Sequence, residues 1–197
     1  MHDFPAGIRR TPLLSVLVAL AAGLCARAAD SDPEAGFVSL FNGRDLTGWC
    51  YPGEPGSFDG KAESSDSRYT AADGILMVHP HTPRVVRKLF TTRQFPTDFV
   101  LRLEFRAGVN ADSGIFLRRP QLQCRDYLIA GPYKTLTRYK PQDWNEIEVV
   151  VTNGFARCTC NGELLEAALK LPPTGGIGLE ADRGQMEYRN IRLKELP

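Results

Sequence analysis

Carboxylates are the side chains of this sequence best suited to acid–base chemistry, because histidine is scarce. Only His79 and His81 lie beyond the first few residues, so proton transfer would depend on Asp and Glu, as in glycoside cleavage. The candidate carboxylates are Glu104, Asp112, Asp126, Glu180, Asp182 and Glu187.

Glu104 lies in the middle of an alternating segment and is flanked by Arg102 and Arg106. One interpretation is a solvated outer face with an Arg–Glu–Arg ladder, in which surface ion pairs add little stability. The other is a polar groove in which Arg102 and Glu104 bind sugar hydroxyls. The sequence leaves both open.

Two amides give a second polar alternation, in which Gln121 and Gln123 share one strand face with Arg125. An amide both donates and accepts hydrogen bonds, which suits a hydroxyl-rich ligand, although a polar edge strand would look the same. Five aromatic residues could stack on sugars or belong to the core. They are Trp49, Tyr127, Tyr133, Tyr139 and Trp144.

Metal-binding patterns are weak in this sequence. His79 and His81 have i, i+2 spacing, but Pro80 and Pro83 favour an irregular loop over a ligand pair. We assign no metal ligand from the sequence and leave the cofactor unknown, with a divalent metal as an open alternative. Cys50, Cys124, Cys158 and Cys160 fit disulfides or buried thiols, and the sequence cannot choose a pairing.

Short alternating strands must position these side chains. In residues 99–106, Phe99, Leu101, Leu103 and Phe105 share one face. Asn153-Gly154 and Asn161-Gly162 each lie between β-type segments, which predicts tight hairpin turns. Residues 163–171 fit a helix or a strand. With 18 Gly and 14 Pro, the chain predicts an all-β, antiparallel β-sandwich or jelly roll.

The N-terminus is typical of a secretory signal peptide. Arg9 and Arg10 precede an uncharged segment, residues 13–24, and Ala26-Arg27-Ala28 is a typical cleavage site. A helix of that segment would be about 18 Å long, too short for a bilayer core of about 30 Å. We therefore predict a signal peptide over residues 1–28, a short leader over 29–35 and a single β-sandwich domain over 36–197. A secreted or periplasmic protein follows, with a lipoprotein at Cys25 as the weaker alternative.

Charge and apolar segment length argue against nucleic acid and membranes as partners. The net charge is +1, whereas nucleic-acid binding requires a basic excess. No further segment is long and apolar enough to span a membrane once the signal is removed. The sequence does not indicate an oligomeric state.

Several segments together resemble the 3-keto-disaccharide hydrolase family, also known as DUF1080. The similarity covers about residues 36–196, nearly all of the chain after the leader. The matching segments are Phe37-Val38-Ser39-Leu40-Phe41-Asn42-Gly43-Arg44-Asp45-Leu46-Thr47-Gly48-Trp49, residues 98–106, Asp112-Ser113-Gly114-Ile115-Phe116-Leu117-Arg118, Gln142-Asp143-Trp144-Asn145-Glu146, Asn161-Gly162, Gly176-Ile177-Gly178-Leu179-Glu180 and residues 188–194.

This resemblance implies a concanavalin A-like lectin/glucanase sandwich that acts on glycosides with a ketone at C3. The ketone acidifies the C2 hydrogen, so a base can remove it while the glycosidic oxygen leaves C1, and water can then add. Such a site requires a base, an acid for the leaving oxygen and a group that stabilises the enolate, either Arg or a metal ion.

The chain departs from the family pattern at two chemical positions. Gln121-Leu122-Gln123 stands where the family commonly has Glu-x-Gln, and Asp182-Arg183-Gly184 stands where it has Asp-His-Gly. An amide cannot act as a general base, and arginine stays protonated near neutral pH.

We therefore take Glu104, Glu180 and Asp182 as catalytic candidates, and Arg102, Gln121, Gln123 and Arg183 as substrate-binding candidates. The expected function is cleavage of 3-keto-glycosides, with a keto-sugar glycoside as partner. The alternatives are a non-catalytic carbohydrate-binding module of the same fold and a scaffold sandwich. Convergence of the three carboxylates in one groove would favour catalysis, whereas their separation onto both sheets would argue against an enzyme.

Overall fold

The computed structural model describes residues 35–129 and 131–197. The predicted signal peptide and residues 29–34 of the leader lie outside the described residues. The described residues belong to one compact unit.

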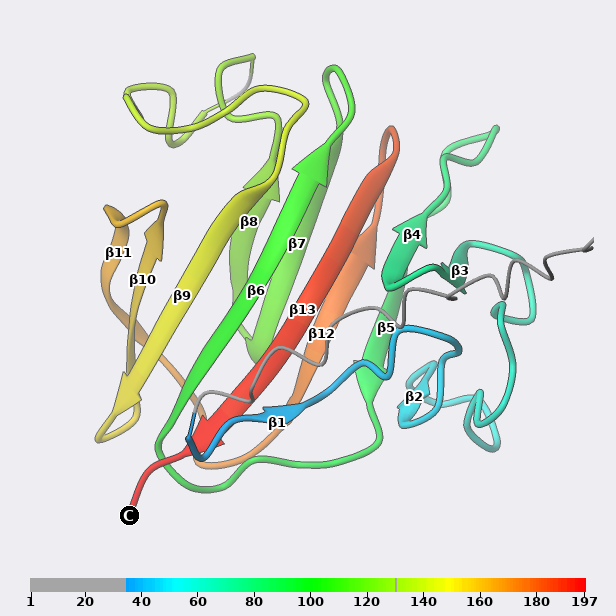
Figure 1. Ribbon diagram of the computed structural model, residues 1–197, viewed down its shortest axis with the longest axis horizontal. Helices are drawn as coiled ribbons and strands as arrows, with labels where there is room; N and C mark the ends of the chain where they lie inside the picture. The colour runs from blue at the N-terminus through cyan, green and yellow to red at the C-terminus, as the bar shows by residue number, and fades with distance from the viewer. Residues whose placement is uncertain (1–34, 130) are drawn as a thin grey trace, which may run out of the picture. The chain divides into compact units, whose positions relative to one another are not determined.

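The described residues form two antiparallel sheets that pack face to face (Figure 1). The larger sheet has the order β11 (Glu163–Lys170), β10 (Phe155–Cys160), β9 (Asn145–Thr152), β6 (Phe99–Ala107), β13 (Met186–Glu195), β4 (Ile75–Val78) and β3 (Tyr69–Ala72), and β1 (Val38–Ser39) pairs with β13. The smaller sheet has the order β2 (Trp49–Cys50), β5 (Arg87–Thr91), β12 (Gly176–Ala181), β7 (Asp112–Arg118) and β8 (Gln121–Arg125).

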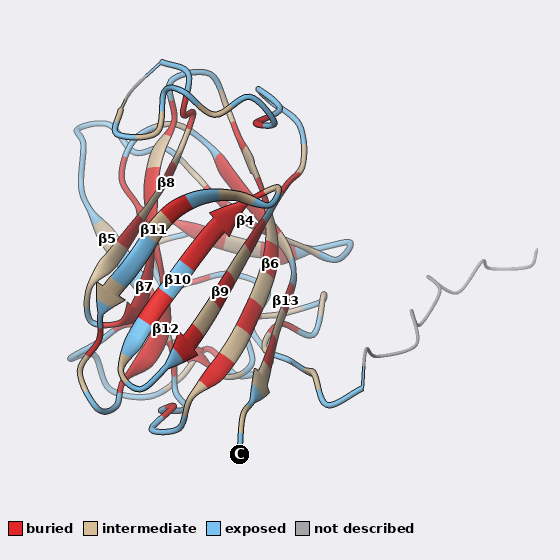
Figure 2. Cartoon of the chain, turned by 90° about the vertical axis from the view of Figure 1, so that its left-hand side faces the viewer, coloured by how far each residue is buried: buried red, intermediate tan, exposed pale blue. Residues whose placement is uncertain are grey.

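Strand alternation places the core between the two sheets. Along β6, Phe99, Leu101, Leu103 and Phe105 are fully buried, whereas the residues between them are partly exposed. The same alternation appears as red and tan bands on β6 and β9 in Figure 2. Side chains from both sheets belong to one hydrophobic cluster. Polar residues that alternate with core residues therefore point away from the opposite sheet.

β12 shows the same rule in the smaller sheet, with an outer face that is nearly bare. Ile177, Leu179 and Ala181 face the core, and Leu179 lies opposite Leu89 of β5. The outward positions before Glu180 are Gly176 and Gly178. Glu180 is thus the first outward side chain beyond glycine on this central strand.

The structure confirms the predicted all-β antiparallel sandwich. Residues 163–170 form strand β11, so the helical alternative for this segment is wrong. Asn153, Gly154, Asn161 and Gly162 all have positive φ, as the predicted hairpin turns require. The sequence analysis missed β2, β3 and β5, which are short. Among the described residues, no helix is long and apolar enough to cross a membrane.

Candidate functional site

Three carboxylates and several cations gather on the outer face of the smaller sheet. Glu180 of β12 lies opposite Lys88 of β5 in register. Asp182 and Asp112 are both close enough to Glu180 to act on its charge. We take this cluster as the candidate site, because it brings two buried acidic groups, Glu180 and Asp182, together on one outward face.

Glu180 is buried, with 8% of its surface exposed. Burial raises the pKa of its carboxyl group, and the negative charge of Asp182 adds to the increase. The amide of Gln121 opposes this shift, because it donates a hydrogen bond to Glu180 at 2.6 Å. Glu180 is therefore a carboxyl group that takes up a proton more readily than an exposed glutamate.

Gly114 allows the Gln121 side chain to reach Glu180. β7 lies between β8 and β12, so Gln121 must cross β7. A Cβ atom on Gly114 would lie 1.9 Å from Nε2 of Gln121. The Gln121 amide thus passes over the backbone of Gly114, where no side chain blocks it. Gln123 lies opposite the same glycine in register.

Asp182 is bound by Arg84, which comes from the loop between β4 and β5. Nη2 of Arg84 donates to Oδ2 of Asp182 at 2.5 Å, and Nε donates to Oδ1. Asp182 is 9% exposed, whereas the Arg84 side chain is 63% exposed. Arg84 therefore covers the carboxylate from the solvent side.

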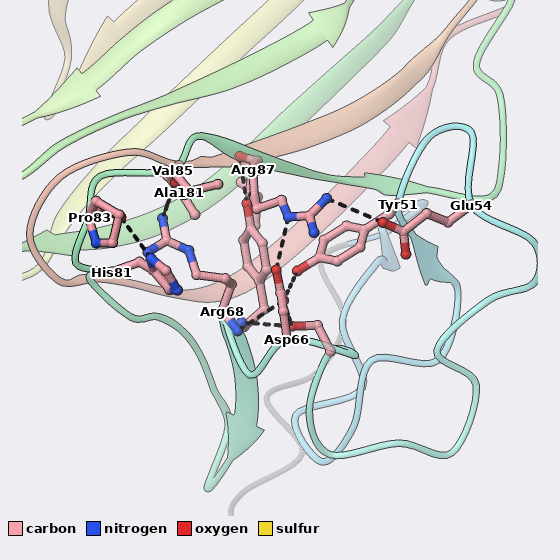
Figure 3. Close-up of polar contacts among 12 residues, drawn as sticks. Tyr51, Glu54, Asp66, Arg68, His81, Pro83, Val85, Arg87 and Ala181 are labelled. Atoms are coloured by element: carbon pink, nitrogen blue, oxygen red, sulfur yellow. Dashed lines mark hydrogen bonds and ion pairs between the residues drawn. The ribbon is translucent and has the colours of Figure 1, made fainter.

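A buried arginine anchors that loop (Figure 3). Nη2 of Arg68 donates to the carbonyl oxygens of Val85 and Ala181, at 3.0 and 2.9 Å. Arg68 is 2% exposed. It therefore ties the residue after Arg84 to the residue before Asp182, so the loop and the end of β12 are held together.

Asp112 is the third carboxylate of the cluster. It accepts a hydrogen bond from Nη2 of Arg125 at 2.6 Å, and Nη2 of Arg183 lies 3.8 Å away. The Arg183 guanidinium also donates to Asn110, and its backbone bridges to Asp112. Arg183 thus stands at the rim of the cluster, with its side chain 46% exposed.

A groove of about 690 Å³ begins next to this cluster. It runs over the outer face of β5, β12 and β7 away from Glu180, and Lys88 is the lining residue that lies opposite Glu180. Its aromatic lining residues are Phe90 and Phe116, and its floor includes Gly176. The volume is within the range that small-molecule ligands occupy.

Glu104 and Arg102 lie on the other sheet. Both alternate with core residues of β6, so they point outward, away from the smaller sheet. Glu104 accepts hydrogen bonds from Arg189 and Asn190, at 2.6 and 2.8 Å, and Arg102 donates to Glu148 at 2.8 Å. The expected convergence of Glu104 with Glu180 and Asp182 does not occur, because the core of the sandwich separates them.

The remaining candidate carboxylates hold other parts of the fold. Glu187 of β13 accepts a hydrogen bond from Arg106, on the same outer face as Glu104. Asp126 is buried and accepts the backbone N–H of Asn110 at 3.0 Å. The smaller sheet therefore gathers Glu180, Asp182, Gln121, Gln123 and Arg183 from the predicted set, and leaves out Glu104 and Arg102.

The predicted aromatic platforms lie elsewhere. Trp49 and Tyr127 are fully buried, and Tyr139 belongs to the core. The ring of Trp144 is contacted by the guanidinium groups of Arg106 and Arg189, at 4.8 and 4.0 Å. The aromatic residues at the candidate site are Phe90 and Phe116. A sequence signal for the strand of Phe90 does exist. It is the short alternation of polar and apolar residues in Arg87-Lys88-Leu89-Phe90-Thr91.

The residues present do not form a metal site. Within residues 35–129 and 131–197, no group of three or more His, Cys, Asp and Glu side chains is arranged to hold a metal ion. His79 bonds to Thr70 and His81 to the carbonyl oxygen of Pro83, so they do not act as a pair. The divalent metal left open above therefore has no supporting ligand set here.

The four cysteines among the described residues are free thiols. Cys124, Cys158 and Cys160 are fully buried. Burial raises the pKa of Cys158 and Cys160 to about 12, so both remain protonated packing residues at neutral pH.

Comparison with known proteins identifies the family. Residues 36–194 match the 3-keto-alpha-glucoside-1,2-lyase-like domain, so the chain belongs to this family. This confirms the resemblance found in the sequence. The comparison with curated proteins found no match.

Solved structures with the same fold include two from Parabacteroides distasonis, each described as a proposed glycosyl hydrolase. The first is 17% identical, with a TM-score of 0.63, and covers 82% of this chain and 94% of that chain. The second is 17% identical, with a TM-score of 0.54, and covers 75% and 99%. The exoplasmic/lumenal domain of VIP36, bound to Ca²⁺ and Man3GlcNAc, is 10% identical, with a TM-score of 0.51, and covers 82% and 89%. At these identities the likeness shows a common glycosyl hydrolase-like sandwich fold.

The raised pKa of Glu180 predicts a specific pH dependence of stability. Native Glu180 binds a proton that the unfolded state has released, so the contribution of Glu180 to stability should fall as pH rises from 4.5 through its native pKa. Glu180→Gln removes this titration, and its stability relative to wild type should increase between pH 4 and pH 8. Urea unfolding at both pH values tests this. Glu146→Gln, at an exposed position of β9, is the control, and an equal gain in that variant would contradict the assignment.

Gly114→Ala should break the contact between Gln121 and Glu180 while the fold stays intact, because the added Cβ clashes with side-chain atoms of Gln121, from Cγ to Nε2, and with no backbone atom at that distance. The pKa of Glu180 should then rise further, since the opposing hydrogen bond is lost. Carbon-13 NMR of labelled glutamate carboxyl groups measures this. In the Gln121→Ala background the same substitution should have no additional effect on that pKa. If the two substitutions changed the pKa of Glu180 additively, Gly114 would influence Glu180 independently of the Gln121 side chain.

Proposed function

We propose that this chain is an exported domain that cleaves the glycosidic bond of 3-keto-glycosides on the outer face of the smaller sheet. Family membership supports the substrate class. The observation that carries the proposal is a buried carboxyl group, Glu180, that lies opposite Lys88, a cation lining a ligand-sized groove. This combination is what proton abstraction next to a carbonyl group requires.

Glu180 is the base in this proposal. Its carboxylate takes the C2 proton of the sugar, and the C–H electrons form the enolate of the C3 ketone. Collapse of the enolate forms the C1–C2 double bond and breaks the C1–O bond, and the leaving oxygen takes up a proton. Water then adds across the double bond, so the net reaction is hydrolysis. Each step balances without an external oxidant or reductant.

Cations around Glu180 are suited to stabilise the enolate oxygen. Lys88 lies opposite Glu180, and Arg84 is close enough to interact electrostatically with the Glu180 carboxylate. Fixed positive groups in a partly dehydrated site lower the energy of a developing negative charge. Asp182 is paired with Arg84 through both of its oxygens, so its role is to fix this guanidinium. Gln123 and Arg183, at the edge of the cluster, are suited to bind sugar hydroxyls.

A carbohydrate-binding module of the same fold is the second candidate function. The amide of Gln121 occupies an oxygen of Glu180, and Arg84 occupies both oxygens of Asp182. A network satisfied in this way is compatible with a site that binds a sugar without cleaving it. Turnover separates the two functions.

Turnover of 3-keto-glucosides by the purified protein should depend on Glu180. Glu180→Gln should lower kcat/KM by about 10²- to 10⁴-fold, the usual effect of removing a general base. Asp182→Asn should lower it less, because Arg84 remains. Release of the aglycone measures the rate, and thermal unfolding verifies the fold of each variant.

The matched control is Glu104→Gln, which removes an arginine-paired carboxylate from the opposite sheet and should leave the rate unchanged. Loss of activity in Glu104→Gln alone would overturn the placement of the site. Saturable sugar binding without turnover would indicate the binding module.

Export through the signal peptide is part of the same proposal. The charge pattern and cleavage site of residues 1–28 support a secreted or periplasmic location. The protein recovered from outside the cytoplasm should begin at Ala29, as read by N-terminal sequencing. A chain that begins at Cys25 and carries lipid would show the lipoprotein alternative instead.

A further inference from the structure

The groove beyond Lys88 has a lining that is both aromatic and cationic. We propose that it binds a planar aromatic group with a negative charge, such as an aryl carboxylate, as the aglycone of the glycoside. The term aglycone rests on the proposed function, whereas binding of the aryl carboxylate itself does not. The groove thus defines which glycosides the site would select.

The aromatic surface is built over a glycine. Phe90 of β5 and Phe116 of β7 have ring centroids 5.6 Å apart and planes inclined at 42°. Both lie opposite Gly178 of β12 in register. A Cβ atom at Gly178 would lie 2.7 Å from the Phe90 ring, so the two rings can meet across the central strand only because that position is glycine. Phe90 remains partly exposed in the groove.

The charge of the lining is one-sided. Lys88, Arg118 and Arg119 line the groove, and none of its described lining residues is a carboxylate. The buried Arg118 guanidinium donates to the carbonyl oxygens of Pro172 and Thr97, at 2.9 and 2.6 Å, and lies over the Phe99 ring, 5.5 Å from its centroid. The carboxylates that act on these cations, Asp98 on Arg118 and Glu180 on Lys88, stand outside the groove lining. The lining itself is cationic, so an anionic ligand is the complementary partner.

The groove also has the right position for an aglycone. Lys88 lies over the Phe116 ring, 4.4 Å from its centroid, and is opposite Glu180 in register. Gly178 comes two residues before Glu180, a separation of about 6.6 Å along a strand and comparable to one sugar ring. A sugar bound at Glu180 would therefore direct its C1 substituent over Lys88 onto the two phenylalanine rings.

Two ligands that differ in charge and hardly in shape test this inference. The probes are 4-hydroxybenzoate and 4-hydroxybenzamide, titrated into the nitrogen-15-labelled protein and followed by NMR. The benzoate should bind about five- to tenfold more tightly, as expected for an added charge-assisted contact. The perturbed amides should include those of Phe90, Phe116 and Gly176, which are groove residues.

Arg119→Gln should remove most of this preference and leave the affinity for the benzamide unchanged. Arg119 is exposed, so the substitution should not affect folding. Phe90→Leu should weaken both ligands equally. Arg157→Gln, at an exposed position of β10 on the other sheet, is the matched control and should change neither affinity.

Equal affinities for the two ligands, or perturbed amides outside the groove, would overturn the inference. A benzoate preference that survives Arg119→Gln and is lost in Arg157→Gln would also overturn it. Because binding is measured without a sugar, a benzoate preference in a protein with no glycosidase activity would support this inference while the proposed function failed. If the protein cleaved 3-keto-glucosides but bound the benzoate and the benzamide equally, the proposed function would be supported and this inference would be overturned.

Discussion

The candidate site depends on the absence of outward side chains along β12 before Glu180. A central strand with one face in the core has only its outer positions available, and here Gly176 and Gly178 precede Glu180. Side chains from neighbouring strands fill the space, since Phe90 covers Gly178 and Gln121 crosses Gly114. Glu180 is consequently surrounded by packed groups and is buried although it points away from the core. Its raised pKa is a direct result of this packing.

Charge around Glu180 is balanced by groups from distant parts of the chain. Arg84 reaches Asp182 from the loop before β5, and Arg125 reaches Asp112 from β8. The buried Arg68 holds the Arg84 loop against the end of β12. Breaking one partner of such a buried network costs more than an exposed pair contributes, because the remaining charge is left uncompensated. The cluster therefore acts as one unit, and a substrate that enters it must replace contacts already made.

The two outer faces of the sandwich have different physical characters. On the larger sheet, Arg102 pairs with Glu148 and Arg189 with Glu104, each across neighbouring strands. Arg189 also lies against Trp144, so that aromatic ring is covered. On the smaller sheet Lys88 lies over the buried Phe116 ring, whereas Phe90 stays partly exposed in an open groove with cations in its lining. This contrast is why we place ligand binding on the smaller sheet.

The sequence by itself determined the sandwich, the outward direction of Glu104 and the hairpin turns, because these depend on local alternation and on the φ preferences of Asn-Gly. It also supplied Glu180 and Asp182 from residue chemistry, Gln121 and Gln123 from polar alternation, and Arg183 through the family resemblance. It could not choose between helix and strand for residues 163–171, which lack a clear period. Only the tertiary structure decided that Glu104 and Arg102 belong to the opposite face, since alternation gives the direction of a side chain relative to its own sheet and not the sheet to which it belongs. The same holds for Arg84, Lys88, Phe90 and Phe116, because contacts across sheet neighbours join residues that are distant in the chain.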